Sequence, residues 1–167
     1  MTYHIRVRPT ALIIENDAVL LVEYEDEDGI HYNLPGGGAE PGETVIDGVL
    51  RELMEETKAE ADVGPLAFVY ECAPHKQSGE YPADTPHALN LIFECKLKPG
   101  SVPGLPEIPD PDQSAVRWVP LSELASIILF PNIKEQIIHY AAQRRSIELI
   151  EDHQLDCYVH NSQKRSD

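Results

Sequence analysis

The first part of the chain alternates between apolar runs and short polar breaks. Apolar residues dominate positions 5–14 and 18–24, and Glu15-Asn16-Asp17 separates the two runs. Asn and Asp are common in turns because their side chains bond to nearby backbone and tolerate left-handed conformations. The pattern therefore predicts a strand hairpin. A further short strand at residues 31–34 leads into the glycine-rich segment Pro35-Gly36-Gly37-Gly38.

The spacing of apolar residues changes to a helical period after this glycine-rich segment. Ile46, Val49, Leu50 and Leu53 recur at intervals of three and four residues, so we expect them to share one buried helix face. Thr44 precedes this run and is the expected N-cap, because its hydroxyl can accept a hydrogen bond from a free amide of the first turn. The sequence therefore predicts a helix that begins next to Thr44.

The chain continues with strands joined by long connections. Strands are predicted at residues 66–72, 88–97 and 116–119. The connection at residues 73–86 is long and polar, which is typical of loops that bind substrate. The connection at residues 99–111 holds five prolines, which make it too stiff and too poor in backbone donors for a helix or a central strand.

Helical patterns return near the C-terminus. A helix start is predicted at residues 120–124, and a final amphipathic helix is predicted to begin near Asn132. The apolar face of this final helix is expected to contain Ile133, Ile137, Tyr140 and Ala141. Residues 146–167 are expected to form a tail, loose at residues 161–167. Strands on both sides of one helix, followed by further helices, predict an α/β fold with a mixed β-sheet sandwiched between helices.

Length and composition narrow the class of protein. At 167 residues the chain is expected to form one domain, residues 1–167, with its core at about residues 5–142. Three cysteines, Cys72, Cys95 and Cys157, form no disulfide framework, which favours a reduced, cytoplasmic setting. The strand pattern begins too early for a signal peptide, and no apolar run approaches membrane-spanning length.

The charge of the chain bears on its partners. A formal net charge of −16 argues against nucleic acid, whose phosphates would be repelled. The same charge poses a problem for an enzyme that acts on phosphates, because its substrate is also an anion. A bound metal ion would supply the missing local positive charge.

Three carboxylates share one face of the helix predicted after Thr44. Glu52, Glu55 and Glu56 occupy positions i, i+3 and i+4, so their side chains converge on one patch. Three like charges repel, and we expect one of these carboxylates to have a raised pKa in the metal-free protein. A hard divalent cation such as Mg²⁺, or Mn²⁺ in its place, resolves the conflict because it takes carboxylate and carbonyl oxygens. A solvated acidic helix face is the alternative interpretation of these three residues alone.

The residues around these carboxylates extend the pattern. The full set, at fixed spacing, is Gly37, Glu43, Arg51, Glu52, Leu53, Glu55 and Glu56. This set resembles the signature of the Nudix hydrolases, or MutT-like proteins, which reads G-x5-E-x7-R-E-U-x-E-E-x-G-U with U aliphatic. One position departs from the signature, because Lys58 stands in place of its second glycine. That glycine normally lets the chain leave the helix in a left-handed conformation.

The resemblance implies a fold, a reaction and roles for these residues. It implies the Nudix α/β/α fold and the attack of water on a diphosphate. The three helix glutamates are expected to bind Mg²⁺ together with the backbone carbonyl of Gly37. Either Glu52 or Glu55 is expected to orient or deprotonate the water. Arg51 is expected to pair with Glu43 and fix the loop against the helix, without a catalytic role.

Four residues outside the signature are candidate substrate contacts. Asp110 and Asp112 precede the strand at residues 116–119, near the place where many relatives carry a further acidic site residue. The alternative explanation is that both aspartates only keep an exposed loop soluble. His87 precedes a strand. It is either a substrate contact or a structural histidine whose hydrogen bonds are made within the protein. Pro74 lies fifteen residues past the signature, where ADP-ribose pyrophosphatases of the family tend to carry a proline.

The sequence thus predicts a hydrolase of a nucleoside diphosphate linked to another group X. The substrate belongs either to the ADP-ribose and nucleotide-sugar class or to the (d)NTP class, and a homodimer is left open. A non-catalytic Nudix-fold nucleotide-binding regulator is one alternative, although it would be expected to have lost a signature carboxylate. An isoprenoid diphosphate isomerase is another alternative. It would require a catalytic cysteine near the signature, and Cys72 lies well beyond it.

Overall fold

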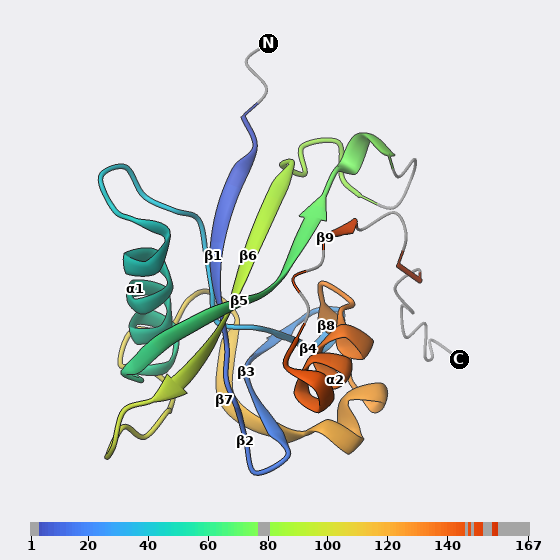
Figure 1. Cartoon of the computed structure of the whole chain (residues 1–167). Coiled ribbons are helices and arrows are strands. Elements are labelled where there is room, and N and C mark those ends of the chain that lie inside the picture. The colour runs from blue at the N-terminus through green and yellow to red at the C-terminus, as the bar shows by residue number, and fades with distance from the viewer. Residues whose placement is uncertain (1–3, 77–80, 146, 148, 152–154, 157–167) are drawn as a thin grey trace.

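The computed structural model of the chain describes residues 4–76, 81–145, 147, 149–151 and 155–156. Within these residues, one sheet joins four strands in the order β1-β6-β5-β9 (Figure 1). The strands are β1 (Arg6–Leu12), β6 (Ala88–Leu97), β5 (Ala61–Cys72) and β9 (Leu149–Glu151). β1 runs parallel to β6 and β9 runs parallel to β5, whereas β5 and β6 are antiparallel. The sheet is therefore mixed.

A second sheet is built around β3 (Ala18–Asp26). Its other strands are β2 (Ile14–Glu15), β4 (Gly29–Asn33), β7 (Gln113–Pro120) and β8 (Leu129–Phe130). β2, β4 and β7 pair antiparallel with β3, and β8 lies parallel to β4. In the turn between β2 and β3, Asn16 and Asp17 have φ angles of 50° and 58°. The predicted hairpin and its turn chemistry are thus confirmed, although β1, the longer part of its first strand, belongs to the other sheet.

Helices cover the strands on both sides. α1 (Val45–Thr57) lies on one side of the strands and α2 (Lys134–Gln143) on the other (Figure 1). Two short 3-10 helices, η1 (Pro74–Lys76) and η2 (Leu121–Ser126), complete the described helical elements. The α/β fold expected from the sequence is confirmed. Its mixed sheet, however, is divided into two.

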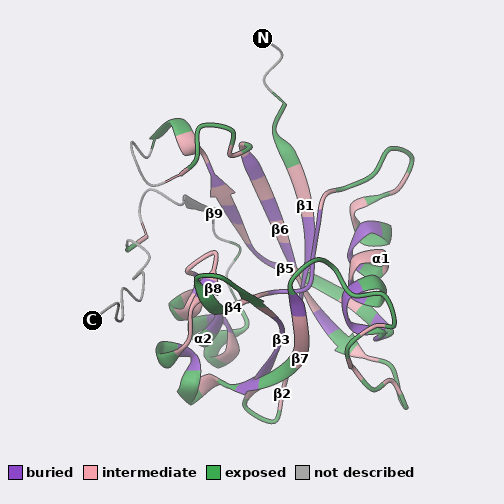
Figure 2. Cartoon of the chain, turned by 180° about the vertical axis from the view of Figure 1, so that it is seen from behind, coloured by how far each residue is buried: buried purple, intermediate pink, exposed green. Residues whose placement is uncertain are grey.

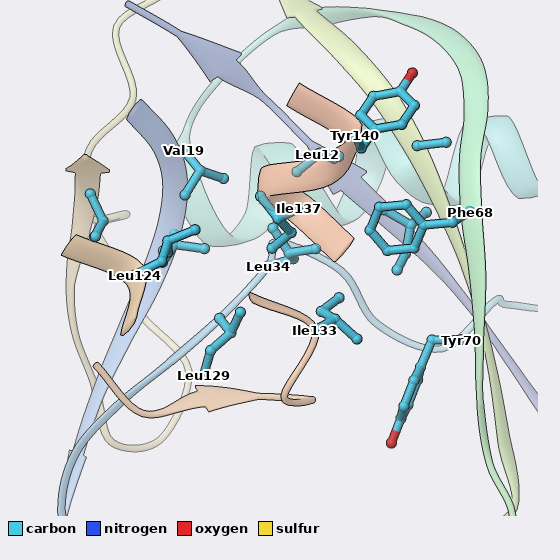
Figure 3. Close-up of a cluster of buried hydrophobic side chains, with 14 of the residues drawn as sticks. Leu12, Val19, Leu34, Phe68, Tyr70, Leu124, Leu129, Ile133, Ile137 and Tyr140 are labelled. Carbon is cyan, nitrogen blue, oxygen red and sulfur yellow. The ribbon is translucent and has the colours of Figure 1, made fainter. Parts of the chain in front are cut away.

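Strand alternation divides the core into two parts. Successive strand residues point to opposite faces, so Ala11 and Ile13 lie on one side of the sheet and Leu12 lies on the other. Ala11 and Ile13 share a buried cluster with Val49 and Leu53 of α1. A larger cluster on the α2 side includes Leu12, Phe68, Ile133, Ile137 and Tyr140 (Figure 3). Each helix therefore packs against the strands through a separate buried cluster.

The buried face of α1 differs from the predicted one. Val49 and Leu53 are fully buried, but Ile46 and Leu50 are each 38% exposed. The buried face is rotated toward Gly48 relative to the predicted one. Gly48 allows this close packing, because a Cβ at this position would stand only 2.8 Å from the Pro9 ring on β1. The helix therefore packs through its Gly48 side and leaves the other apolar edge in solvent. Figure 2 shows buried and exposed residues alternating along its turns.

Both ends of α1 have defined caps. The hydroxyl of Thr44 accepts from the amide of Asp47 at 3.1 Å, and the Asp47 carboxylate accepts from the Thr44 amide at 3.0 Å. This capping box confirms Thr44 as the N-cap. At the other end Lys58 has φ 58° and ψ 11°, and its amide donates to the carbonyl of Met54. Lys58 thus adopts the left-handed conformation that a glycine normally takes at this position.

Several element boundaries differ from the sequence prediction. β5 begins at Ala61 rather than at residue 66, and β7 begins at Gln113 rather than at residue 116. The short strands β8 and β9 were not predicted, and β9 falls within the expected tail. Residues 98–112 form neither helix nor strand, as their prolines predicted. Residues 161–167 lie outside the described part of the chain.

No helix among the described residues is long and apolar enough to cross a membrane.

Candidate active site

A cavity of about 490 Å³ lies beside the glycine-rich loop and α1. Gly37, Glu52, Glu55 and Glu56, the residues expected to bind metal, all line it. Asp110, from the connection before β7, lines the same cavity. The fold therefore gathers acidic residues from the helix and from a segment more than fifty residues away around one space.

Gly37 lies so close to the Glu52 carboxylate that a side chain at residue 37 would force this carboxylate to move. A Cβ built on Gly37 would stand 2.3 Å from Oε1 of Glu52, a distance that real Cβ atoms do not reach. The amide of Gly37 also donates to the carbonyl of Pro9 on β1 at 3.3 Å. A glycine here lets the Glu52 carboxylate lie directly against the loop backbone.

Arg51 holds the loop and the helix carboxylates together. Its guanidinium donates to both carboxylate oxygens of Glu43, at 3.0 and 2.8 Å, and to the carbonyl of Gly38 at 3.0 Å. The same guanidinium donates to Glu52 at 2.7 Å and to Glu55 at 3.2 Å. These bonds to Glu43 raise the pKa of Arg51, and Arg51 in turn lowers the pKa of Glu43 to about 2. One positive charge thus offsets repulsion among three carboxylates.

Glu56 is the buried member of the helix trio. Its side chain accepts from the amide of Gly36 at 2.8 Å and from the hydroxyl of Tyr24 at 3.2 Å. Only 6% of the residue is exposed. Burial raises the pKa of Glu56 to about 7, and the negative charge of Glu52 adds to the effect. The expected raised carboxylate pKa is therefore present, but its main cause is burial rather than repulsion.

The donor set of this cavity fits a hard divalent cation. Carboxylate oxygens and a closely approaching loop backbone are the groups that such ions take. Among the described residues, no three His, Cys, Asp or Glu side chains are already gathered tightly enough to hold a metal ion. Arg51 bonds to Glu52 and Glu55, while Glu56 is turned toward the Gly36 amide. Ligation would exchange some of these bonds for bonds to the ion.

Two arginines of β1 line the same cavity and were not found from the sequence. Arg6 and Arg8 alternate on the strand and therefore point to the same face. Arg8 donates to the carbonyl of Gly36 at 3.1 Å, and a Cβ on Gly38 would meet the Arg6 guanidinium. Burial, followed by the charge of Arg6, lowers the pKa of Arg8 from its ordinary value, although arginine remains charged. A strongly acidic chain thus places positive charge at this site.

A second cavity, of about 460 Å³, adjoins the first. The two cavities share four lining residues, which are Arg6, Arg8, Asn33 and Gly36. The rest of the second cavity is largely apolar and aromatic, with Tyr70, Tyr81, Phe130 and Ile133 among its walls. A charged compartment and an aromatic compartment therefore meet at the arginines of β1.

The four candidate substrate contacts fall in different places. Of the two aspartates, only Asp110 lines the carboxylate cavity, whereas the carbonyl of Asp112 accepts from the amide of Glu25. His87 bonds through Nε2 to Glu71 at 2.7 Å, and its ring lies 5.6 Å from that of His75. Pro74 begins η1. Neither Pro74 nor His87 lines either of these cavities, although the neighbours Pro86 and Ala88 line the second.

The family model of the Nudix domain matches residues 5–141. Because the match covers most of the chain, this protein belongs to the Nudix family, and it is a Nudix hydrolase. Nudix hydrolases generally need a divalent metal ion. No curated protein sequence matches the chain significantly.

Solved structures with the same fold include three informative ones. An ADP-ribose pyrophosphatase from Streptococcus suis has a TM-score of 0.63 and 22% identity, covering 87% of this chain and 99% of its own. A Nudix hydrolase from Nitrosomonas europaea has a TM-score of 0.66 and 23% identity, with coverage of 85% and 92%. A UDP-X diphosphatase has a TM-score of 0.64 and 22% identity, with coverage of 89% and 68%. At these identities the likeness shows the fold alone.

Proposed function

We propose that this Nudix hydrolase cleaves the diphosphate linkage of a nucleoside diphosphate joined to another group X, using Mg²⁺. The observation that carries the proposal is the mixed charge of one cavity. Carboxylates of Glu52, Glu55 and Glu56 suit a hard cation, and the guanidinium groups of Arg6 and Arg8 suit phosphate oxygens. A diphosphate bound between them would meet positive charge on both sides.

The signature residues divide into two groups with different tasks in this proposal. The three glutamates and the Gly37 carbonyl hold the ion, and a bound Mg²⁺ neutralises charge on the diphosphate. Arg51 and Glu43 fix the loop against the helix through their paired hydrogen bonds. Mn²⁺ satisfies the same donor set.

The water that attacks phosphorus needs a base or an orienting group. Glu55 is the most accessible carboxylate of the trio, with 59% of its side chain exposed, whereas Glu52 has 13% exposed. Both accept from the same nitrogen of Arg51, so both carboxylates are aimed at one region of the cavity. Either Glu52 or Glu55 can therefore receive the proton or orient the water.

The structural neighbours support the substrate class. One is an ADP-ribose pyrophosphatase and another is a UDP-X diphosphatase, and both of these substrates join a nucleoside diphosphate to a further group. The (d)NTP class has the same phosphate chemistry and stays within the proposal. The reduced cytoplasmic setting and a small-molecule partner remain predictions from the sequence.

The two alternatives make different demands on the site. A non-catalytic regulator would be expected to lack a signature carboxylate, and all of them are present. An isoprenoid diphosphate isomerase would require a cysteine beside the glutamates. Cys72 lines the second cavity and not the carboxylate cavity.

A hydrolysis screen tests the proposal. The purified protein is incubated with Mg²⁺ and ADP-ribose, nucleotide sugars, dinucleoside polyphosphates, (d)NTPs or isopentenyl diphosphate, and products are identified by mass. We expect cleavage of a diphosphate linkage that stops in EDTA and falls by orders of magnitude in Glu55→Gln and Glu56→Gln. Glu60→Gln, an exposed acid after α1, is the matched control and should keep its activity. Isomerisation of isopentenyl diphosphate, or full activity in EDTA, would contradict the proposal.

A further inference from the structure

The hydroxyl of Tyr24 donates a hydrogen bond to the buried carboxylate of Glu56. The bond joins the Tyr24 oxygen to Oε1 of Glu56 across 3.2 Å, while Oε2 accepts from the Gly36 amide at 2.8 Å. Tyr24 belongs to β3, lies 32 positions before Glu56 in the chain, and lines the carboxylate cavity. Both oxygens of the buried glutamate are therefore held, and one of them is held by a side chain that has no role in the proposed function.

Strand pairing fixes the direction of the Tyr24 side chain. Tyr24 lies opposite His31 of β4 and opposite Gln113 of β7. The register of β3 with β7 shifts between Glu23 and Tyr24, so that Ser114 is passed over. Irregularities of this kind re-aim side chains beside functional sites. Because residues directly opposite each other point to the same face, Gln113 rather than Ser114 shares a face with Tyr24.

Gln113 shows that this face meets the C-terminal end of α1. Its carboxamide nitrogen donates to the main-chain carbonyl of Glu56 at 2.7 Å, and its carboxamide oxygen accepts from the amide of Asp110 at 3.2 Å. Two paired strand residues thus bond to two parts of one helix residue. The bond from Gln113 fixes the backbone of Glu56, and the bond from Tyr24 fixes the direction of its carboxylate.

Tyr24 is itself held by a stack of rings. Its ring lies within 11° of parallel to that of His31, with the two centroids 5.5 Å apart. The ring of His31 meets that of Phe130 edge-on, with centroids 5.2 Å apart. Packed rings restrict rotation of the Tyr24 side chain, so its hydroxyl is presented to Glu56 from a fixed position.

A hydroxyl donor suits a carboxylate that also binds a cation. An ionised carboxylate offers about four lone-pair positions on its two oxygens. The bonds from Tyr24 and Gly36 take one position on each oxygen of Glu56, which leaves the other position of each oxygen for an ion. The bond from Tyr24 therefore orients Glu56 without competing with ligation.

We propose that Tyr24 is a positioning residue that holds the Glu56 carboxylate in place for Mg²⁺. Tyr24 acts through Glu56 and not by a contact with substrate. Replacing a group that bonds to a metal ligand in this way typically changes metal affinity about 10- to 100-fold. The assignment rests on the proposed function, because it takes the ion to bind at Glu56.

A titration with Mn²⁺ tests the inference without an assay of activity. The electron paramagnetic resonance signal of free Mn²⁺ gives the dissociation constant and the number of ions bound, at neutral pH. Tyr24→Phe removes the hydroxyl and keeps the ring that stacks on His31. We expect the dissociation constant of Tyr24→Phe to be about 10- to 100-fold higher than that of wild type.

Tyr140→Phe is the matched control. The hydroxyl of Tyr140 also donates to a carboxylate, that of Glu94 at 2.6 Å, but Tyr140 lines neither of the two cavities. Tyr140→Phe should therefore bind Mn²⁺ as wild type does. Equal dissociation constants in wild type and Tyr24→Phe would overturn the inference alone, whereas a wild type that binds no Mn²⁺ would contradict the proposed function as well.

The number of ions bound separates positioning from a defect of folding. At saturating Mn²⁺, Tyr24→Phe should bind as many ions as wild type, because the ligands themselves are unchanged. In hydrolysis, its rate should be low at limiting Mg²⁺ and should reach the wild-type kcat at saturating Mg²⁺, with an unchanged KM for the nucleotide. A smaller number of bound ions, or a rate that excess Mg²⁺ does not restore, would overturn the positioning role.

Discussion

Glu56 accepts a hydrogen bond from the backbone amide of Gly36 across 2.8 Å. The bond joins the helix that carries the carboxylates to the loop that faces them. The main-chain carbonyl of the same residue accepts from the side chain of Gln113, at the start of β7, at 2.7 Å. Glu56 is therefore a support of the fold as well as a site residue, and its buried charge is costly unless a cation is near.

This burial gives the metal-free protein a defined pH dependence. The pKa of Glu56 is about 7 in the fold, against an ordinary value of 4.5, so the folded state holds its proton more tightly than the unfolded state. Stability should be greatest below about pH 4.5 as far as Glu56 is concerned, and it should fall as pH rises toward 7. We expect a loss on the order of 1–3 kcal/mol in EDTA.

Glu56→Gln isolates this contribution. Glutamine keeps an acceptor for the Gly36 amide but cannot ionise, so the loss of stability between pH 4.5 and 7 should shrink and the metal-free variant should be more stable at pH 7 than wild type. Denaturant unfolding at a series of pH values in EDTA measures it. Identical pH profiles for the two proteins would contradict a buried charge at this position.

The packing of α1 is tested by two neighbouring leucines. Leu53 is fully buried, whereas Leu50 is 38% exposed. Leu53→Ala should lower the free energy of unfolding by about 2–5 kcal/mol, because it leaves a cavity in the core. Leu50→Ala should cost less than about 1 kcal/mol. Equal losses would mean that both leucines are buried, as the sequence predicted. They would contradict the orientation of α1 in the structure, in which only Leu53 is buried.

Lys58 ends α1 in a left-handed conformation at φ 58°. A residue with a Cβ adopts this conformation at a cost, so Lys58→Gly should stabilise the protein by about 0.5–1 kcal/mol. Lys98→Gly is the control, since Lys98 is not among the residues with positive φ and gains nothing from glycine. A loss of stability in Lys58→Gly would mean that the helix continues through this position in solution.

Gly37 is predicted to be essential for activity because its lack of a side chain leaves room for the Glu52 carboxylate. A methyl group at residue 37 would displace the carboxylate of Glu52, which lies where the Cβ would stand. Misplacing a catalytic group by about 1 Å costs on the order of 100-fold in rate, and we expect such a loss of turnover in Gly37→Ala. Gly104→Ala is the matched control, because its nearest neighbour would be 3.6 Å away. Wild-type turnover in Gly37→Ala would show that Glu52 does not act at the loop.

The local parts of the site could be predicted from the sequence. Helical spacing places Glu52, Glu55 and Glu56 on one face, and the resemblance to the family signature implied the pairing of Arg51 with Glu43, residues only eight positions apart. Thr44 could be recognised as the N-cap because capping depends on the next three residues alone. Such features need no knowledge of tertiary structure.

The distant parts of the site could not be predicted in the same way. Arg6 and Arg8 reach the cavity because β1 runs beside the glycine-rich loop, and the alternation of strand residues alone does not tell which neighbours their face meets. Asp110 lines the cavity and Asp112 does not, although both precede the same strand. Asn33 lines both cavities. Its position beside Phe130 depends on the pairing of β4 with β8, a strand of only two residues without a sequence signal.

Binding of Mg²⁺ at the helix carboxylates is the central claim, and thermal melting tests it most directly. Wild type, Glu56→Gln and the control Glu60→Gln are melted in EDTA and in saturating Mg²⁺ at neutral pH. An ion that binds only the folded state raises the melting temperature, so wild type and Glu60→Gln should gain equally. Glu56→Gln should lose most of that gain while remaining folded. An equal gain in all three proteins would place the metal elsewhere and contradict the account.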